Sequence, residues 1–346
     1  MKTKRTFFLY SLFTLLLIVA GCGTGSAVNS SDNDSDGSAT ENGSDADYEL
    51  ELISFLPVNH PLTEEVVPMW IDKIESGTNG AISIDWLGGP ETMPTDNQYD
   101  AVRNGLVDVG FLSTAYFVSM MPEAQSMYVS PYTAEEEREH GYFDYLTDRF
   151  DQQGVSYLGR WQSGQFYIWS NKDVESIDEL SGTSFRSNPM YHDVQKELGM
   201  TPVNVAPGDV YTSLERGMVD GFFFTLNGPR VDGWTEVTNY IINEPIMEVS
   251  STIVMNPDVL GGLPDDLQNQ VKELTAEFET DLKEYMDKEI EEEWEALESE
   301  GVEKIELTDD ETDKLQQLVT DVKWNTLKET VDEDQFNKLE ELLLIN

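Results

Sequence analysis

The sequence contains a single cysteine and few basic residues. Because Cys22 is the only cysteine among 346 residues, no disulfide can form within the chain. Lysine and arginine together number 21, against 67 aspartate and glutamate residues, which gives a formal net charge of −46. Proteins that bind nucleic acid need clustered lysine and arginine side chains for their phosphate contacts. Nucleic acid is therefore excluded as an expected partner.

Motifs of catalysis and of metal binding are also missing. The histidines His60, His140 and His192 do not stand at the spacing of metal ligands. The chain has no nucleophile elbow, phosphate loop or dinucleotide-binding fingerprint. Carboxylates are so numerous that a pair of them carries no information about glycosidase chemistry. We therefore expect neither an enzyme nor a bound metal or cofactor.

The acidic residues are spread along the chain and are not gathered into one tail. This distribution predicts a uniformly anionic, strongly hydrated surface, and we favour a halophilic host as its cause. At about 1 M salt the Debye length is about 3 Å, so that the self-repulsion of such a surface is largely screened. An acidic protein from a non-halophilic host is the alternative interpretation.

The amino terminus has the layout of an export signal. Basic residues in the first five positions precede an apolar run from Phe7 to Ala20, which is too short to span a bilayer comfortably. The run ends in Val19-Ala20-Gly21-Cys22, which resembles a bacterial lipobox. We therefore predict a signal peptide over residues 1–22, lipidation of Cys22, and anchoring to the outer face of the cytoplasmic membrane. A plain signal peptide with an incidental cysteine is the alternative.

Residues 23–47 consist almost entirely of small and polar residues and contain no aromatic residue. Such a segment cannot recover its ordering entropy by burying apolar surface. We predict a flexible acidic linker. The remaining 300 or so residues are rich enough in apolar side chains for one large or two medium domains.

A ten-residue pattern occurs twice, 112 positions apart. Tyr99 to Asp108 and Tyr211 to Asp220 both read Y-x-x-[VL]-x-x-G-x-V-D. The spacing predicts the end of a helix stopped by a glycine, followed by a buried strand. The offset suits two α/β lobes, whose ligand lies between them near the carboxyl ends of strands. Chance similarity of two ordinary turns is the alternative.

Strand-like apolar runs alternate with helical patterns along the chain, as doubly wound α/β lobes require. A long amphipathic helix is predicted from Pro264 to Glu298, and Thr308 with Glu311 predicts a capping box that opens another helix. The predicted strands are Glu49–Phe55, Ala81–Leu87, Val107–Ser113, Val155–Trp161, Phe166–Ser170, Thr183–Arg186, Thr201–Val205, Gly221–Leu226 and Ser251–Met255.

Several of these motifs, taken in order, resemble the DctP family, the extracytoplasmic solute-binding proteins of TRAP transporters. The most specific are the segment Leu180-x-Gly-x-x-x-Arg186 and the second G-x-V-D-G, at residues 217–221. The others are Asn59-His60-Pro61, Gly80 to Ile84, Gly88-Gly89, Ala101 to Asp108, Pro131-Tyr132 and Leu263 to Gln268.

The resemblance implies a two-lobed α/β fold of the periplasmic-binding-protein type (type II), with the long helix spanning the hinge. We expect discontinuous lobes, the first of residues 48–163 plus 250–289 and the second of residues 164–249 plus 290–346. The resemblance also implies a receptor that captures a small organic acid and delivers it to the small and large TRAP membrane subunits. A receptor of the same fold that signals instead of feeding a transporter is the alternative.

Arg186 is the first candidate ligand residue, because the arginine of this motif holds the solute carboxylate in the resembling family. A guanidinium suits this role, since its planar fork donates two parallel hydrogen bonds and stays charged when partly buried. The alternative is a structural arginine that pairs with a neighbouring carboxylate.

The chain departs from the family pattern at two positions. Phe166 stands where many members have a second arginine, and Phe223 and Phe224 stand where they have glutamate and asparagine. If these side chains face the cleft, the solute is a monocarboxylate with an apolar or aromatic body. The alternative is that the phenylalanines are the core of a buried strand. We add Asn188 and Asn227 to the candidate ligand residues.

The first lobe contributes two further candidates, His60 and Tyr116, because each follows a predicted strand at its carboxyl end. Tyr116 can stack on a solute and also form a hydrogen bond with it. His60 is a candidate ligand, although a histidine beside proline is more often a helix cap. Trp161 is interpreted as a core residue or as a wall of the cleft.

Overall fold

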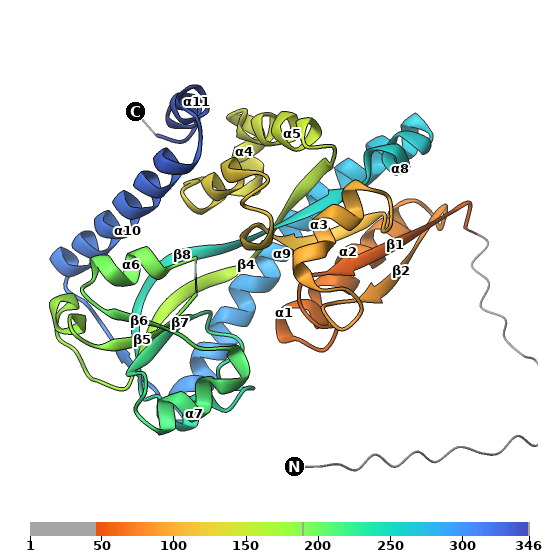
Figure 1. The fold of residues 1–346 in the computed structure, drawn as a ribbon. Coiled ribbons are helices and arrows are strands. Elements are labelled where there is room, and N and C mark those ends of the chain that lie inside the picture. Colours follow the sequence, from red (N-terminus) through yellow and green to blue (C-terminus); the bar gives the residue numbers. More distant parts are fainter. Residues whose placement is uncertain (1–45, 189, 345–346) are drawn as a thin grey trace, which may run out of the picture. The chain divides into compact units, whose positions relative to one another are not determined.

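The structure, a computed structural model, describes residues 46–188 and 190–344 (Figure 1). The predicted signal peptide, the lipidation site Cys22 and nearly all of the linker 23–47 lie outside the described residues. Within these two ranges, no helix combines the length and the hydropathy needed to cross a bilayer.

A single mixed sheet of nine strands organises the fold. The strand order is β2-β1-β3-β8-β4-β7-β5-β6, and β9 pairs with β8 off this path. The strands are β1 Tyr48–Ser54, β2 Ile82–Gly88, β3 Val109–Ser113, β4 Ser156–Ser170, β5 Ser184–Ser187, β6 Thr201–Asn204, β7 Gly221–Phe224, β8 Tyr240–Met255 and β9 Glu303–Ile305.

Two long antiparallel strands, β4 and β8, join the two halves of this sheet (Figure 1). The end of β8, residues 251–255, pairs with β3, and the end of β4, residues 167–170, pairs with β7. Between these pairings, the register of β4 against β8 shifts between Gln162 and Gln165. The predicted strands Val155–Trp161 and Phe166–Ser170 are therefore one irregular strand. The bulge that joins them lies where the halves meet, and we call residues 162–165 and 248–250 the strand crossing.

Eleven α-helices and five short 3₁₀ helices lie in the described part of the chain. The α-helices are α1 Pro61–Glu64, α2 Val66–Gly77, α3 Thr95–Arg103, α4 Ala134–Glu139, α5 Tyr142–Gln152, α6 His192–Glu197, α7 Val210–Glu215, α8 Pro257–Gly262, α9 Asp265–Ser299, α10 Asp309–Thr330 and α11 Glu333–Leu343. The 3₁₀ helices are η1 Thr114–Tyr116, η2 Pro122–Tyr128, η3 Ile177–Leu180, η4 Pro207–Asp209 and η5 Trp234–Glu236.

Helices cover both faces of each half of the sheet, so that the core consists of four apolar clusters. In the first half, one cluster contains Trp70 of α2 and the other contains Phe150 of α5. In the second half, Val194 of α6 and Leu214 of α7 belong to the clusters on the two faces. A sheet covered on both faces explains why its strands are continuous apolar runs in the sequence.

The predicted long helix is confirmed as α9, and it packs against both halves of the sheet. Its first part contributes Val271 and Phe278 to the cluster around Trp70. Its last part contributes Leu297 to the cluster around Leu214. Asp265 and Asp266 lie in its first turn, where a negative charge is favourable to the helix dipole.

The C-terminal helices also connect the two halves. Leu315 and Val319 of α10 pack with residues of the second half, whereas Leu327 of the same helix packs with Phe150 of the first half. The helix α11 packs in that first-half cluster as well, through Leu339 and its neighbours. The predicted division into lobes 48–163 plus 250–289 and 164–249 plus 290–346 stays a prediction, because the described residues fall in one compact unit.

The sequence repeat corresponds to the same helix-to-strand unit in each half. The helices α3 and α7 both end before a glycine with positive φ, Gly105 at 69° and Gly217 at 65°. Asp108 and Asp220 then occupy matching positions. The carboxylate of Asp108 accepts a hydrogen bond from the Glu51 amide at 2.8 Å, and that of Asp220 accepts one from the Ser184 amide at 2.8 Å. Each aspartate thus ties its unit to the neighbouring parallel strand.

The predicted capping box before α10 forms only in part. The Thr308 side chain accepts a hydrogen bond from the Glu311 amide, as predicted. The Glu311 carboxylate, however, accepts a hydrogen bond from the Ile177 amide at 2.9 Å. The prediction of a reciprocal box was wrong because a distant segment in η3 supplies the donor, and α10 is thereby attached to η3.

We expect the melting temperature to rise as salt is increased from about 0.1 to about 1 M NaCl, because added ions screen the repulsion between carboxylates. Differential scanning fluorimetry of the purified protein measures this directly. Sucrose of equal osmolality is the control, since an osmolyte stabilises by exclusion and not by screening. If the melting temperature does not change with salt, or rises by the same amount in sucrose, the halophilic interpretation of the net charge of −46 is contradicted.

Candidate functional site

Six of the seven predicted ligand residues lie at or beyond the carboxyl ends of strands in both halves of the sheet, whereas Phe166 lies within β4. His60 follows β1, and Tyr116 follows β3, which is parallel to β1. Arg186 lies near the end of β5, and Phe224 ends β7, which is parallel to β5. In open α/β sheets, ligands bind beyond the carboxyl ends of the strands. The placement is therefore the one expected of a binding site.

Arg186 is buried, with 6% of its surface exposed. Its Nε donates a hydrogen bond to the Val205 carbonyl at 3.2 Å, and its Nη1 donates one to the Tyr191 hydroxyl. Burial raises the pKa of Tyr191 to about 12, so that this hydroxyl is neutral at physiological pH. Among the described residues, Arg186 forms no ion pair with a carboxylate. The alternative of a structural arginine paired with a neighbouring acid is not observed there.

Aromatic side chains surround the Tyr191 ring beside Arg186. The Phe166 ring lies 5.6 Å from the Tyr191 ring and 5.9 Å from the Phe224 ring, measured between centroids. Phe224 in turn lies 5.1 Å from Trp234. Phe166 is buried and Phe224 is partly exposed. Arg186, Phe166 and Phe224 are thus brought together through Tyr191, a residue that sequence reasoning missed although it follows Arg186 by five positions.

The two candidate asparagines lie in turns. The Asn188 side chain accepts a hydrogen bond from the Met190 amide at 2.9 Å, which is a local turn interaction. The Asn227 carbonyl accepts one from the Thr225 hydroxyl at 2.7 Å. The Asn227 side chain has no hydrogen-bond partner within the described residues. Of the two asparagines, Asn227 is therefore the one whose side-chain amide is available for a hydrogen bond to a ligand.

His60 caps a helix, which was the alternative reading of this residue. Its Nδ1 accepts a hydrogen bond from the Leu62 amide at 3.1 Å, at the start of α1. Burial lowers the pKa of His60, while the charge of Asp232 raises it. Because Nδ1 is an acceptor, the proton of the neutral ring is on Nε2, which can donate to a ligand. A ligand role for His60 stays a prediction.

Tyr116 is the most exposed of the candidates, with 44% of its surface accessible. Its ring centroid lies 6.4 Å from that of Phe55, which lies 5.3 Å from that of Trp161. Trp161 is fully buried in the first core cluster. The core interpretation of Trp161 is therefore confirmed, while Tyr116 is free to contact a ligand.

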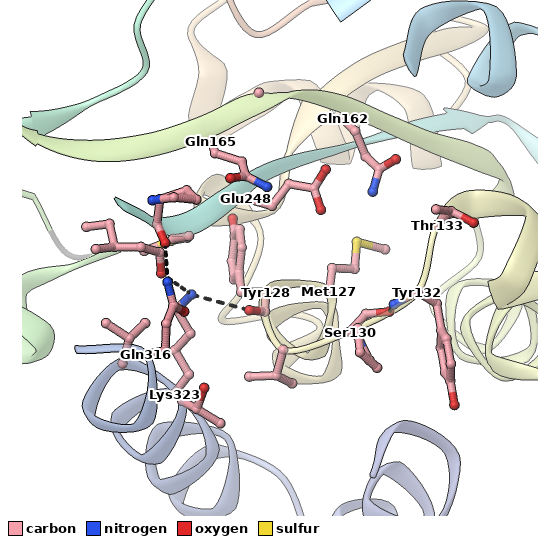
Figure 2. A pocket seen from close by; sticks show the side chains of 18 of the residues that line it. Met127, Tyr128, Ser130, Tyr132, Thr133, Gln162, Gln165, Glu248, Gln316 and Lys323 are labelled. Atoms are coloured by element: carbon pink, nitrogen blue, oxygen red, sulfur yellow. Dashed lines mark hydrogen bonds between the residues drawn. The ribbon is translucent and has the colours of Figure 1, made fainter. Parts of the chain in front are cut away.

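Two cavities lie near these residues, and none of the seven predicted ligand residues lines either of them. The smaller, of about 120 Å³, lies between the residues that follow β3 and those of α6. It is lined by Thr114, Ala115, Val118, Gln125, Tyr128, Met190, Asp193, Val194, Met247, Val322, Lys323 and Thr326. The larger, of about 700 Å³, lies at the strand crossing (Figure 2).

Lys323 of α10 lines both cavities. Its ammonium group donates hydrogen bonds to the carbonyls of Tyr128 at 3.3 Å and Ile246 at 3.2 Å. Burial lowers the pKa of Lys323 to about 7, although the charge of Glu248 opposes this effect. Sequence reasoning missed this residue, because a lysine on an amphipathic helix has the same pattern as a solvated one.

A cluster of buried charges lies beside the strand crossing. Arg160 of β4 is 1% exposed, pairs with Glu137 of α4, and donates through Nε to the Ser250 hydroxyl at 2.9 Å. The Glu279 carboxylate of α9 accepts a hydrogen bond from the backbone amide of Arg160 at 2.5 Å and forms an ion pair with Arg138 at 2.5 Å. Burial raises the pKa of Glu279 to about 7. This cluster, also missed from sequence, connects β4, β8, α4 and α9.

Comparison with known families decides the relationship that the motifs suggested. The sequence model of the DctP family, described as bacterial extracellular solute-binding protein family 7, matches residues 53–329. The chain belongs to the DctP family. The match covers most of the described residues and includes both copies of the repeat and Arg186. The family binds solutes, so the prediction that the chain is not an enzyme is confirmed.

Individual DctP relatives are distant in sequence. The ectoine/5-hydroxyectoine-binding periplasmic protein UehA of Ruegeria pomeroyi is 24% identical over 187 residues, which are 50% of this chain and 54% of UehA. The monocarboxylate 2-oxoacid-binding periplasmic protein of a Nostoc species is 21% identical over 219 residues, 59% of each chain. The chain therefore spans a little more than half the length of these curated relatives.

Solved TRAP solute-binding proteins share the fold. The periplasmic protein of Desulfovibrio salexigens with bound orotic acid superposes with a TM-score of 0.73 at 18% identity, covering 86% of this chain and 97% of that one. This likeness confirms the predicted two-lobed α/β fold.

Proposed function

We propose that this protein is the extracytoplasmic solute receptor of a TRAP transporter, and that Arg186 binds the carboxylate of a small organic acid. The observation that carries the proposal is a buried guanidinium whose partners, the Val205 carbonyl and the Tyr191 hydroxyl, are both neutral. In a chain with a net charge of −46, such a group is the feature most complementary to an anion.

The energetic argument rests on the cost of burying a charge. An ionised group without a counter-charge costs several kcal/mol in a protein interior, and proteins normally pair or neutralise it. Arginine does not lose its proton, so the guanidinium stays charged. A bound carboxylate would supply the missing counter-charge through two parallel hydrogen bonds. The ligand would thus offset the desolvation free energy of the Arg186 guanidinium, which the unliganded protein does not compensate with a counter-charge.

The aromatic neighbours of Arg186 favour an apolar or aromatic body on this acid. Phe166 and Phe224 form an edge-to-face pair, and Phe166 also packs edge-to-face on Tyr191, the residue that binds Arg186. Rings of this kind stack on flat or apolar groups and offer no partner to a second carboxylate. Relatives named for a monocarboxylate 2-oxoacid and for orotic acid are compatible with such a solute.

Closure of the two lobes would complete the site. His60 and Tyr116 come from the first half of the sheet, and Arg186, Asn188, Phe224 and Asn227 come from the second. A ligand that contacts both halves stabilises the closed state, because only that state provides both sets of contacts. The closed receptor, held at the membrane by lipid on Cys22, would dock on the small and large membrane subunits and release the solute.

A thermal-shift screen of organic acids in high salt tests the binding function. We expect monocarboxylates with an apolar or aromatic body to raise the melting temperature more than dicarboxylates or sugar acids do. Uptake of the best ligand by vesicles that contain the membrane subunits then tests the transport function. Binding without receptor-dependent uptake would contradict the transport role and favour a sensing one.

The Phe224→Asn variant should prefer more polar acids than the wild type. Asparagine removes an apolar surface and adds a donor and an acceptor, at a position where the wild-type ring is partly exposed. Titration calorimetry with a matched pair of acids, one apolar and one hydroxylated, measures the change in preference. The Phe223→Leu variant is the control, because Phe223 is fully buried in the core. An unchanged preference in Phe224→Asn would remove Phe224 from the site.

A further inference from the structure

The cavity of about 700 Å³ at the strand crossing is separate from the predicted solute residues, and its walls come from five parts of the chain. These are the segment Met127–Thr133, the paired strands β4 and β8 through Gln162, Gly164, Gln165 and Pro245–Glu248, the middle of α9, the helix α10, and Leu343 with Leu344. Figure 2 shows Glu248 between Gln162 and Gln165 on one wall, with the Tyr128 ring below them.

The polar groups on this wall have few partners. Gln165 and Glu248 are a cross-strand pair, so their side chains share one face of the sheet. Neither the side-chain amide of Gln162 nor that of Gln165 has a hydrogen-bond partner among the described residues. The nearest cation to the Glu248 carboxylate is Arg160, at 4.0 Å, and 31% of the Glu248 side chain is exposed. These groups are therefore available to a ligand.

The charges around the cavity compensate Glu248 only weakly, because its one ion pair, with Arg160, is long at 4.0 Å. Arg160 is already paired with Glu137, and Arg138 is already paired with Glu279. Three carboxylates thus share two guanidinium groups, and Glu248 is the most weakly paired of them, 4.0 Å from a guanidinium that Glu137 also binds. Lys323 also lines the cavity, but its ammonium group is held by two backbone carbonyls, and burial lowers its pKa to about 7. On α9, Lys283 and Asp287 neutralise each other at 2.7 Å.

We propose that this cavity binds a small organic ammonium ion, with Glu248 as its counter-charge, the Gln162 and Gln165 amide oxygens as acceptors, and the Tyr128 ring as an aromatic wall. A carboxylate beside an aromatic face is the arrangement that attracts alkylammonium and quaternary ammonium groups. A metal ion fits less well, because the described residues contain no group of three or more metal-ligating side chains. Met127 and Met286 on the walls are flexible enough to adapt to alkyl substituents.

Choline is the first probe, because it carries a quaternary ammonium group, and its uncharged carbon analogue dimethylbutanol controls for shape. Titration calorimetry at constant salt should show binding of choline and no binding of the alcohol. In the Glu248→Gln variant, which keeps the shape of the side chain, we expect choline affinity to fall by about tenfold or more. The matched control is Glu175→Gln, which removes an exposed carboxylate outside the cavity and should bind choline like the wild type.

A second variant tests the location without changing any charge. Thr320 is an exposed residue of α10 that lines the cavity, and Thr320→Trp should fill the cavity and abolish choline binding while the protein stays folded. The Arg186→Ala variant should bind choline like the wild type, which separates this site from the proposed solute site. The inference is overturned by no choline binding to the wild type, by equal affinity in Glu248→Gln, or by loss of choline binding in Arg186→Ala.

Discussion

Replacement of Arg186 by alanine is expected to abolish the rise in melting temperature that an organic acid causes in the wild type. The two hydrogen bonds of a guanidinium to a carboxylate are charge-assisted, and their loss should weaken binding by about 3 kcal/mol, or about a hundredfold. At the same ligand concentration, the stabilisation given by mass action then disappears. Differential scanning fluorimetry with and without the acid measures the effect.

The unliganded melting curve of Arg186→Ala should stay close to that of the wild type. The variant loses the hydrogen bonds to Val205 and Tyr191, but it also removes a buried charge without a counter-charge, and the two effects oppose each other. Arg216→Ala is the matched control, because Arg216 is exposed on the same half of the sheet. A ligand-induced shift that survives in Arg186→Ala, or that is also lost in Arg216→Ala, would refute the role given to Arg186.

Replacement of Arg160 by methionine is expected to lower the free energy of unfolding by about 3–5 kcal/mol, because it leaves Glu137 buried and unpaired. Glu137 is 1% exposed, and its remaining hydrogen bond from the Ser130 hydroxyl, at 2.7 Å, does not replace a cation. The substitution also removes the links from Arg160 to Ser250 and to the Met127 carbonyl. Urea unfolding in high salt measures the change.

Two variants control this experiment. Arg103→Met removes an arginine whose ion pair with Asp100 is exposed, and we expect a change of about 0.5 kcal/mol or less. The double variant Arg160→Met with Glu137→Met removes both buried charges and should recover much of the lost stability. If Arg160→Met alone costs less than about 1 kcal/mol, the buried cluster does not stabilise the strand crossing.

Much of the fold could be predicted from local patterns. The repeat predicted a helix, a glycine turn and a strand in each half, and both copies have this form because Gly105 and Gly217 adopt positive φ. The periodicity from Pro264 to Glu298 predicted α9 to within a residue or two at each end. The first part of β8 was missed, since Glu244, Pro245 and Glu248 interrupt its apolar pattern. That segment is a strand because β4 pairs with it at residues 240–242 and again at residues 247 and 248.

The candidate site could be predicted only in part. Strand-end positions predicted where Arg186, Tyr116 and His60 lie in the topology, because a strand's carboxyl end can be read from the chain itself. Phe224 was a candidate only through the family resemblance, since the predicted strand Gly221–Leu226 ran past it, whereas β7 ends at Phe224. The partners of these residues could not be predicted. The contact of Arg186 with the Val205 carbonyl joins β5 to the residue that follows β6, and its contact with Tyr191 depends on how α6 begins.

The sequence by itself determined the fold class, the duplicated unit, the long helix and the family, because each depends on periodicity and on turn residues that neighbouring positions decide. Only the tertiary structure decided which charges are compensated. Arg160 pairs with Glu137 across 23 positions of sequence, Glu248 has only a 4.0 Å ion pair with the same arginine, and Lys323 donates hydrogen bonds to two carbonyls from distant segments. Such pairings depend on packing between elements far apart in the chain, and a local sequence pattern does not predict them.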